Sequence, residues 1–198
     1  EVSKAVLGSV TTYEGIAREL HESNPLRWQV AHRKKWLAMQ ERHLFRTIGT
    51  LPVAEITPPI LLKPLQVIDK QGKHETATSV RQYASQVFEY AIQTGRRTAF
   101  NPATPLRRAI RAPIQKSYGA LTDVKALPGL IRAIDGYHGR GATREALWLS
   151  ALLFQRPGNI RAMEWSWVNL DPQTLTIPSA ALKRTEAAKL QGKPHEVP

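Results

Sequence analysis

The sequence predicts a mainly α-helical protein in two parts, the second of which ends in a small antiparallel β sheet. In residues 75–94, apolar side chains recur at helical spacing over five turns. Near residue 106 the composition changes to a basic, proline-containing stretch, which is typical of a boundary between domains. After Glu164 the apolar period shortens towards two, as in short strands.

Residues 1–105 are predicted to form a helical bundle. The first helix begins after Thr11 or Thr12, either of which can cap its amino terminus, and runs to about Glu22. The second helix covers about residues 26–45. Its polar side carries three adjacent cations, which are Arg33, Lys34 and Lys35.

Two further helices complete this first part. One opens at the pair Thr57–Pro58, which suits an N-cap and a first helical position, and Pro64 is expected to kink or shorten it. The other, over about 75–94, is the clearest element, and Gly95 occupies the place of a C-terminal glycine. Its apolar face is made of Ala77, Val80, Tyr83, Ala84, Val87, Phe88, Ala91 and Ile92.

Residues 106–118 are predicted to be an extended basic linker. Pro105 and Pro113 disfavour helix, and no acidic residue lies among the cations. These cations are Arg107, Arg108, Arg111 and Lys116.

Residues 119–198 are predicted to form a second domain. Thr122 can cap a first helix, which Pro128–Gly129 interrupts. A helix over about 143–154 is apolar nearly all round, which predicts that it is buried in the middle of a domain. Strands over 165–170 and 174–178 are then expected to form a hairpin.

Composition narrows the function class. The 198 residues carry 28 Lys and Arg against 16 Asp and Glu, a formal charge of +12 that favours binding to a polyanion. The absence of cysteine excludes disulfides and thiolate chemistry, and the six histidines do not cluster as metal ligands. No apolar run is long enough to span a bilayer, so we expect a cytoplasmic protein that binds nucleic acid. The chain starts at Glu1 rather than methionine, so we expect a piece of a longer protein.

One motif points to chemistry. Arg156 follows the apolar helix and precedes a Pro157–Gly158 turn. An arginine at the mouth of a buried helix needs a partner, and its planar fork matches two oxygens of a phosphate. The alternative is a structural arginine that pairs with Glu164 or caps a carbonyl.

These stretches together resemble the tyrosine site-specific recombinases, specifically the phage-type integrases of bacterial genomic islands. The resemblance covers most of the chain. The first half is similar to the family's core-binding domain, a SAM-like helical bundle, and the second half to the amino-terminal part of its α+β catalytic domain, here truncated. The matching stretches are Trp36 to Gly49, Pro52 to Pro58, Glu75 to Ala77, Val87 to Gly95, Asn101 to Ala103, Leu149 to Trp165, and Ile177–Pro178 with Leu182–Lys183.

The resemblance implies DNA strand cleavage and rejoining through a 3′-phosphotyrosyl intermediate, with neither cofactor nor metal. Arg156 matches the family's first catalytic arginine, and Lys183 matches the hairpin lysine that acts as general acid. Lys189 and Lys193 are alternatives for that lysine. Asn159 stands where family members often carry an acidic residue. All five tyrosines precede Arg156, so none matches the nucleophile, and this chain is expected to bind DNA without cleaving it.

The implied partner is duplex DNA at an attachment site in the bacterial nucleoid, bound by a tetramer of the full-length protein and not by a membrane. Side chains that suit groove reading lie opposite the apolar face of the 75–94 helix. The candidates there are Thr78, Arg81 and Gln82, with Lys73 at the helix start. The phosphate candidates are Arg33, Lys34, Lys35, Arg107, Arg108, Arg111 and Lys116. Two alternatives stay open: a non-enzymatic helical DNA-binding protein with a structural Arg156, and a basic surface for acidic proteins or membranes.

Overall fold

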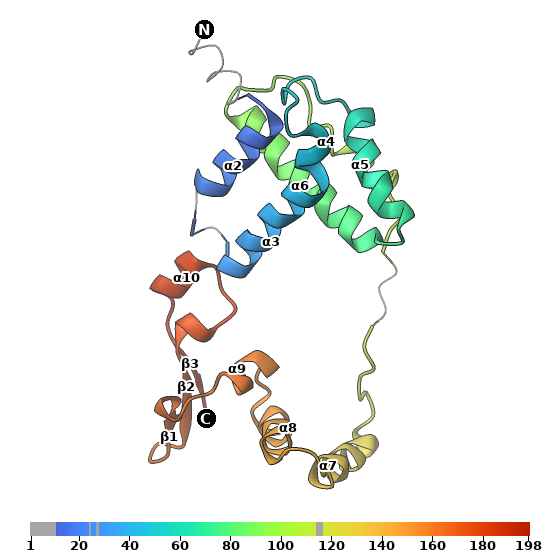
Figure 1. Cartoon of the computed structure of the whole chain (residues 1–198). Helices are drawn as coiled ribbons and strands as arrows, with labels where there is room; N and C mark the ends of the chain where they lie inside the picture. Colours follow the sequence, from blue (N-terminus) through green and yellow to red (C-terminus); the bar gives the residue numbers. More distant parts are fainter. Residues whose placement is uncertain (1–10, 24, 27, 114–116) are drawn as a thin grey trace. The chain divides into compact units, whose positions relative to one another are not determined.

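Two units make up the computed structural model, and they divide between residues 115 and 116 (Figure 1). The structure describes residues 11–23, 25–26, 28–113 and 117–198. The first unit is helical, whereas the second combines short helices with a three-stranded antiparallel sheet. The predicted fold class, mainly α with a small β-hairpin sheet in the second part, is therefore confirmed.

Helix α6 is the centre of the first unit and packs against α2, α3 and α5 (Figure 1). Helix α3 continues through a π-helical turn, η1, into α4, so this helix extends beyond the predicted residue 45. The bounds are α2 Tyr13–Ser23, α3 Val30–Gln40, η1 Glu41–Phe45, α4 Arg46–Ile48, α5 Pro58–Lys70 and α6 His74–Gln93.

Several predicted helix ends are confirmed by their hydrogen bonds and dihedral angles. Thr12 Oγ1 accepts a hydrogen bond from the Gly15 amide at 3.2 Å, so Thr12 caps α2. Gly95 has φ = +72°, the left-handed conformation that glycine adopts readily after a helix. The shortening expected at Pro64 is wrong, because α5 runs through Pro64 as far as Lys70.

The core of the first unit runs between all of its long helices. Tyr13, Trp36 and Phe88 are fully buried, and the rings of Tyr13 and Phe88 lie 5.4 Å apart. The predicted apolar face of α6 is buried except for Ile92, which is 38% exposed. Ile92 follows Ala91 by one residue, and this step turns its side chain about 100° away from the buried stripe.

The extended linker predicted over 106–118 is wrong for its first part. Residues Pro105–Arg108 form a 3-10 helix, η2, and Leu106 and Ile110 are buried in the core of the first unit. Two apolar residues four positions apart anchor this segment, although cations surround them. The first unit thus extends beyond the predicted boundary at residue 105.

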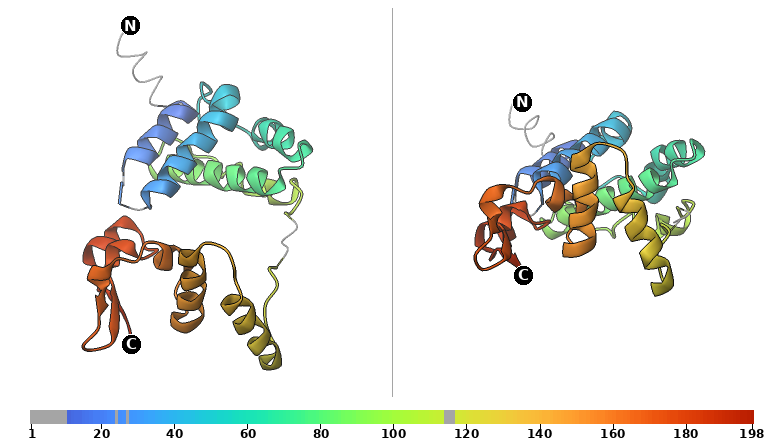
Figure 2. Two further views of the ribbon diagram at one scale, coloured as in Figure 1. Left: turned by 60° about the horizontal axis from the view of Figure 1, so that its bottom comes forward. Right: turned by 90° about the horizontal axis from the view of Figure 1, so that it is seen from below.

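The second unit is built around a narrow antiparallel sheet in the order β1-β2-β3. Val168 on β1 pairs with Leu175 on β2, and Ile177 on β2 pairs with His195 on β3. Figure 2 shows α10 near one end of this ladder and the turn between β1 and β2 at the other. The bounds are η3 Val124–Ala126, α7 Leu127–Asp135, α8 Gly141–Leu153, α9 Pro157–Arg161, η4 Trp165–Trp167, β1 Val168–Asn169, β2 Thr174–Ile177, η5 Ser179–Ala181, α10 Glu186–Gln191 and β3 His195–Val197.

The predicted burial of the apolar helix in the second unit is wrong. No residue of α8 is buried, and Leu152 is 68% exposed. Helix α8 packs against the short helices α7 and α9, and Leu153 near its end contacts the apolar cluster of the sheet. These neighbours leave much of its circumference uncovered. An apolar helix is buried only where other elements surround it.

Three local predictions in the second unit also need correction. The cap of η3 is Asp123 rather than Thr122, and its carboxylate accepts a hydrogen bond from the Lys125 amide at 2.9 Å. Pro128 lies in the first turn of α7, where a missing amide proton costs nothing, so it starts the helix rather than interrupting it. Of the strand predicted over 165–170, Trp165–Trp167 form the 3-10 turn η4, and Val168–Asn169 form the strand β1.

Candidate nucleic-acid interface

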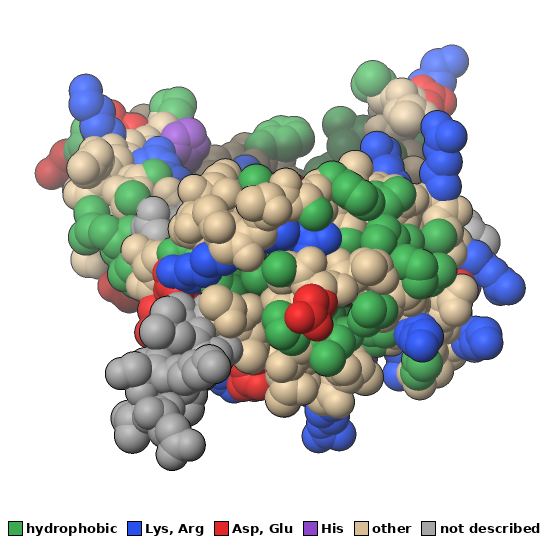
Figure 3. All heavy atoms as spheres, turned by 90° about the horizontal axis from the view of Figure 1, so that it is seen from above, with side chains coloured by type: hydrophobic (Ala, Val, Ile, Leu, Met, Phe, Trp, Pro, Cys, Tyr) green, Lys and Arg blue, Asp and Glu red, His purple; other side chains and the backbone are tan. Residues whose placement is uncertain are grey.

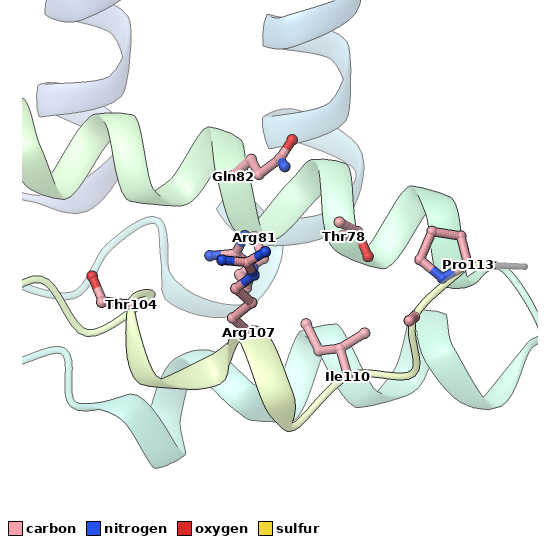
Figure 4. A pocket seen from close by; sticks show the side chains of 8 residues that line it. Thr78, Arg81, Gln82, Thr104, Arg107, Ile110 and Pro113 are labelled. Carbon is pink, nitrogen blue, oxygen red and sulfur yellow. The ribbon is translucent and has the colours of Figure 1, made fainter. Parts of the chain in front are cut away.

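Helix α6 and the segment that follows it enclose a basic pocket of about 600 Å³. Thr78, Arg81 and Gln82 project from the polar side of α6, as the helical spacing predicted. Arg107 comes from η2, and in Figure 4 its guanidinium group lies close to that of Arg81. The remaining lining residues are Thr104, Ile110, Ala112 and Pro113.

The charge of this pocket is uncompensated. Two effects lower the pKa of Arg81: burial is the larger one, and the positive charge of Arg107 is the smaller. Arginine nevertheless stays protonated at neutral pH, so both side chains remain cations. None of the ion pairs among the described residues includes Arg81 or Arg107.

The loop opposite α6 is fixed by hydrogen bonds. Asn101 Nδ2 donates to the Ser85 carbonyl at 3.1 Å and to Ser85 Oγ at 2.8 Å. Asn101 Oδ1 accepts from the Ala103 amide at 3.0 Å. Arg81 Nη1 in turn donates to the Ala103 carbonyl at 3.2 Å. The pocket therefore has defined walls on both sides.

A second hollow adjoins the first and shares Thr104 and Arg107 with it. It adds Arg108, which is exposed. Figure 3 also shows basic side chains, drawn in blue, at several separate places on the surface, with acidic side chains among them.

The other predicted phosphate contacts lie outside these hollows. Lys34 and Lys35 are exposed on α3, whereas Arg33 Nε donates to the His21 carbonyl at 3.1 Å. Lys73 is exposed just before α6 and donates to Gln71 Oε1 at 3.1 Å. Lys116 lies outside the described residues.

Arg111 extends from the segment after η2 towards α5. Its Nε lies 3.9 Å from Asp69 Oδ2, and Asp69 Oδ1 is 2.6 Å from His74 Nδ1. The Arg111 side chain is still 78% exposed, so it stays accessible to a second anion.

Arg156 directly precedes the short helix α9, as the sequence predicted. Its carbonyl accepts from the amides of Asn159 at 2.8 Å and Ile160 at 3.2 Å, while its side chain is exposed. The structural alternative offered two contacts for Arg156, and one of them, the ion pair with Glu164, is not formed in the described part of the chain. Glu164 Oε2 instead accepts from Ser166 Oγ at 3.3 Å.

The predicted hairpin lysines differ in their surroundings. Lys183 is exposed and follows η5 in the segment that joins β2 to β3. Lys189 is paired with Glu186 at 3.0 Å, whereas Lys193 is exposed. The shared catalytic role of Arg156 and Lys183 stays a prediction.

Two site residues were not singled out from the sequence. Thr104 lines both hollows, although no motif marks it. Arg184 Nη1 donates to Ser179 Oγ at 3.0 Å and to the Lys193 carbonyl at 2.9 Å, which ties together the two ends of the β2–β3 connection. The sequence shows Arg184 next to Lys183, but its hydrogen bonds depend on how the β2–β3 connection folds, which the sequence pattern does not reveal.

Neither a metal centre nor a membrane span emerges from the described ranges. The His, Asp and Glu side chains there form no group of three that could hold a metal ion. No helix in these ranges has both the length and the hydropathy needed to cross a bilayer.

Comparisons with known proteins agree with this picture. Residues 13–109 match the family described as "Phage integrase central domain". The protein IntB of Escherichia coli strain K12 is 30% identical over 167 residues, which are 84% of this chain and 41% of IntB. The integrase of Enterobacteria phage P4 is 32% identical over 168 residues, which are 85% of this chain and 38% of that integrase.

A solved structure shares the fold. It is the lambda integrase dimer bound to a COC′ core site, with a TM-score of 0.65 and 20% identity, and the match covers all of this chain and 52% of that one. The chain thus spans about two fifths of the length of the curated relatives named above. On the matched central domain and the integrase relatives, the chain belongs to the phage integrases of the tyrosine recombinase family.

Proposed function

We propose that this chain binds duplex DNA and forms part of an enzyme that recombines DNA site-specifically. The observation that carries the proposal is the basic pocket between α6 and η2, where two arginines face one hollow without an acidic partner. Such a surface suits the phosphate backbone of DNA.

The side chains around the pocket divide into two roles. Thr78 and Gln82 are of the types that hydrogen-bond to base edges, so we assign them to groove contacts. Arg81, which the sequence placed among the groove contacts, shares the pocket with Arg107, and we therefore assign it to a phosphate instead. Arg107 and Arg108 are likewise assigned to phosphates, which fix the register without specifying the sequence. Outer phosphate contacts would come from Arg33, Lys34, Lys35, Lys73, Arg111 and Lys116.

The two units would then have separate tasks. We assign the first unit to the core-binding domain, with the boundary moved past residue 105 because Leu106 and Ile110 belong to its core. We assign the second unit to the amino-terminal part of the catalytic domain, and the basic stretch between them to the crossing of the duplex.

The proposed chemistry uses a tyrosine hydroxyl that attacks a DNA phosphodiester and forms a 3′-phosphotyrosyl bond, while the 5′-oxygen leaves. Arg156 would stabilise charge on the non-bridging oxygens, and Lys183 would protonate the departing oxygen. The protein–DNA ester conserves the phosphoester energy, so a second DNA strand can reverse the step without a cofactor. All five tyrosines precede Arg156, so we place the nucleophile outside these 198 residues.

A binding titration tests the proposal. The chain is added to a short labelled DNA duplex of mixed sequence, and unlabelled duplex or anionic phospholipid vesicles compete for it. We expect duplex binding whose log affinity falls linearly with log salt, because phosphate contacts release counterions. Co-sedimentation of the chain with the vesicles, together with no measurable affinity for the duplex, would favour a membrane or acidic partner instead.

The cleavage role has its own assay. On a suicide duplex that traps a covalent intermediate, we expect the 198-residue chain to leave no adduct on a denaturing gel. An adduct that maps to one of its five tyrosines would show that the nucleophile lies within the chain.

A further inference from the structure

We propose that Arg81 and Arg107 act as one clamp that holds a single DNA phosphate between α6 and η2. The inference rests on the DNA-binding function proposed above and deepens it, because it assigns one ligand group to two side chains from different elements. It predicts that the two arginines contribute to binding jointly rather than independently.

The first support is the close approach of two like charges. Arg81 and Arg107 line the same pocket, as Figure 4 shows, and neither side chain has an ion-pair partner among the described residues. Two cations that face one hollow repel each other in the free protein. An anion bound between them is attracted by both, and this attraction outweighs the repulsion.

The second support is that the neighbouring carboxylates are engaged elsewhere. Glu89 on α6 accepts from Ser85 Oγ at 2.9 Å and from Asn101 Nδ2 at 3.3 Å. Asp69 on α5 is bound by His74 and approached by Arg111. The segment from residue 104 to 113 contains no acidic residue. Glu75, the other acidic residue of α6, does not line the pocket and is in none of the ion pairs of the described residues. We therefore assign the anion that completes the pair to a ligand from outside this surface.

The third support is preorganisation. Arg81 uses one of its five N–H donors on the Ala103 carbonyl, which leaves the others available. Leu106 and Ile110 anchor η2 in the core, so the backbone that carries Arg107 is held in place. Guanidinium forks on fixed elements match the geometry of phosphate oxygens, and a phosphate held there would seat α6 beside the neighbouring groove.

A double-mutant cycle on the 198-residue chain tests this inference. Arg81→Ala and Arg107→Ala are each expected to lower the affinity for a mixed-sequence duplex roughly tenfold or more, as for a lost charged hydrogen bond. The double variant should bind about as weakly as the weaker single variant, because both side chains hold the same phosphate. The slope of log affinity against log salt should fall by about 0.9 in the single variants and in the double variant alike, since one phosphate contact is lost in each.

Arg108→Ala is the matched control, because Arg108 has the same charge and lies in the same turn but does not line the Arg81 pocket. Combining Arg108→Ala with Arg81→Ala should multiply the two losses. Circular dichroism checks folding, and Arg81→Lys, which keeps the charge but not the fork, replaces Arg81→Ala in the cycle if the alanine variant unfolds.

Two outcomes would overturn the clamp while leaving DNA binding intact. Losses that multiply for Arg81 and Arg107 would mean two separate phosphates, and unchanged affinity in both variants would mean that the pair lies off the interface. A parent chain that fails to bind the duplex at low salt would overturn the proposed function itself.

Discussion

The two units of this integrase chain differ most in how much of their apolar surface they bury. In the first unit, one core connects every long helix, and Trp36 and Phe88 have no exposed surface. In the second unit, the sheet's buried cluster among the described residues consists of Leu175, Ile177, Leu182 and Val197. Burial of apolar area is the main stabilising contribution, so the first unit should be the more stable of the two.

This difference also separates the two kinds of candidate residue. The predicted DNA contacts Arg81 and Arg107 stand on the well-packed first unit, where helix packing fixes their positions. The predicted catalytic residues Arg156 and Lys183 lie at the ends of short elements in the second unit. Substitutions in the first unit should therefore change binding, and those in the second unit should change chemistry.

The largest expected effect concerns the chemistry of the second unit, in a form of the protein that cleaves DNA. Lys183→Ala should slow strand cleavage by roughly 10²–10⁴-fold, the usual contribution of a general acid. A substrate with sulfur in place of the departing 5′-oxygen should restore the rate, because a thiolate leaves without protonation. Quenched-flow assays on both substrates measure the rescue.

The matched variants decide which residue supplies the proton. Arg156→Ala should be slow on both substrates, since its proposed partner is a non-bridging oxygen. If the sulfur substrate restores the rate of Lys189→Ala or Lys193→Ala but not that of Lys183→Ala, the general acid is that other lysine of the β2–β3 connection.

The next effect concerns core packing. Trp36→Ala should reduce the unfolding free energy of the first unit by about 3–5 kcal/mol, because it empties a fully buried site and removes the 2.8 Å hydrogen bond to Gln86. Trp165→Ala, at a site that is 85% exposed in the second unit, should change stability by less than about 0.5 kcal/mol. Urea titrations followed by circular dichroism compare the two, and similar losses would contradict the difference in packing.

A smaller effect is expected from one buried hydroxyl. Tyr13 Oη donates to Gln40 Oε1 at 2.9 Å in the core, so Tyr13→Phe leaves a buried amide oxygen without its donor. We expect a loss of about 1–3 kcal/mol in urea unfolding. Tyr118→Phe, at a tyrosine that is 98% exposed, serves as the control, and a loss there as large as in Tyr13→Phe would contradict the account.

The smallest effect is a pH dependence. Hydrogen bonding from Arg96 holds the pKa of Glu19 below its ordinary value, despite the opposing effect of burial. Between the folded and unfolded pKa values the unfolded chain binds more protons, so the unfolding free energy should fall as the pH falls through this range. Glu19→Gln should flatten that acid limb.

The pH prediction also has a matched control in the second unit. Glu145 is 61% exposed, and its ion pair among the described residues is with its neighbour Arg144. Glu145→Gln should leave the acid limb unchanged in urea titrations repeated at several pH values. An acid limb that is identical in Glu19→Gln and the parent chain would remove Glu19 from the explanation.

Sequence patterns predicted the elements whose partners are close along the chain. The buried stripe of α6, the cap at Thr12 and the turn after Gly95 follow from local spacing and residue type, which one helix decides by itself. The polar face with Arg81 and Gln82 followed from the same spacing.

The remaining features depend on contacts between distant segments. The conformation of residues 105–110 depends on the burial of Leu106 and Ile110 in the core of the first unit. The surrounding arginines and prolines predicted an extended linker, and no local pattern indicated this burial. The approach of Arg107 to Arg81 requires that the loop at Asn101 be fastened to α6. The exposure of α8 depends on which elements cover it, and its own apolar sequence does not reveal this.

The most direct test removes three positive charges from one unit or from the other and compares the effects on DNA binding. One variant replaces Arg81, Arg107 and Arg108 in the first unit by alanine, and the other replaces the exposed Arg132, Arg140 and Arg144 of the second unit. The salt dependence of duplex affinity is measured for both and for the parent chain. We predict that the first variant has a weaker affinity and a shallower salt slope while the second stays close to the parent. Equal losses in both variants would show that net charge, rather than the α6 surface, carries the binding.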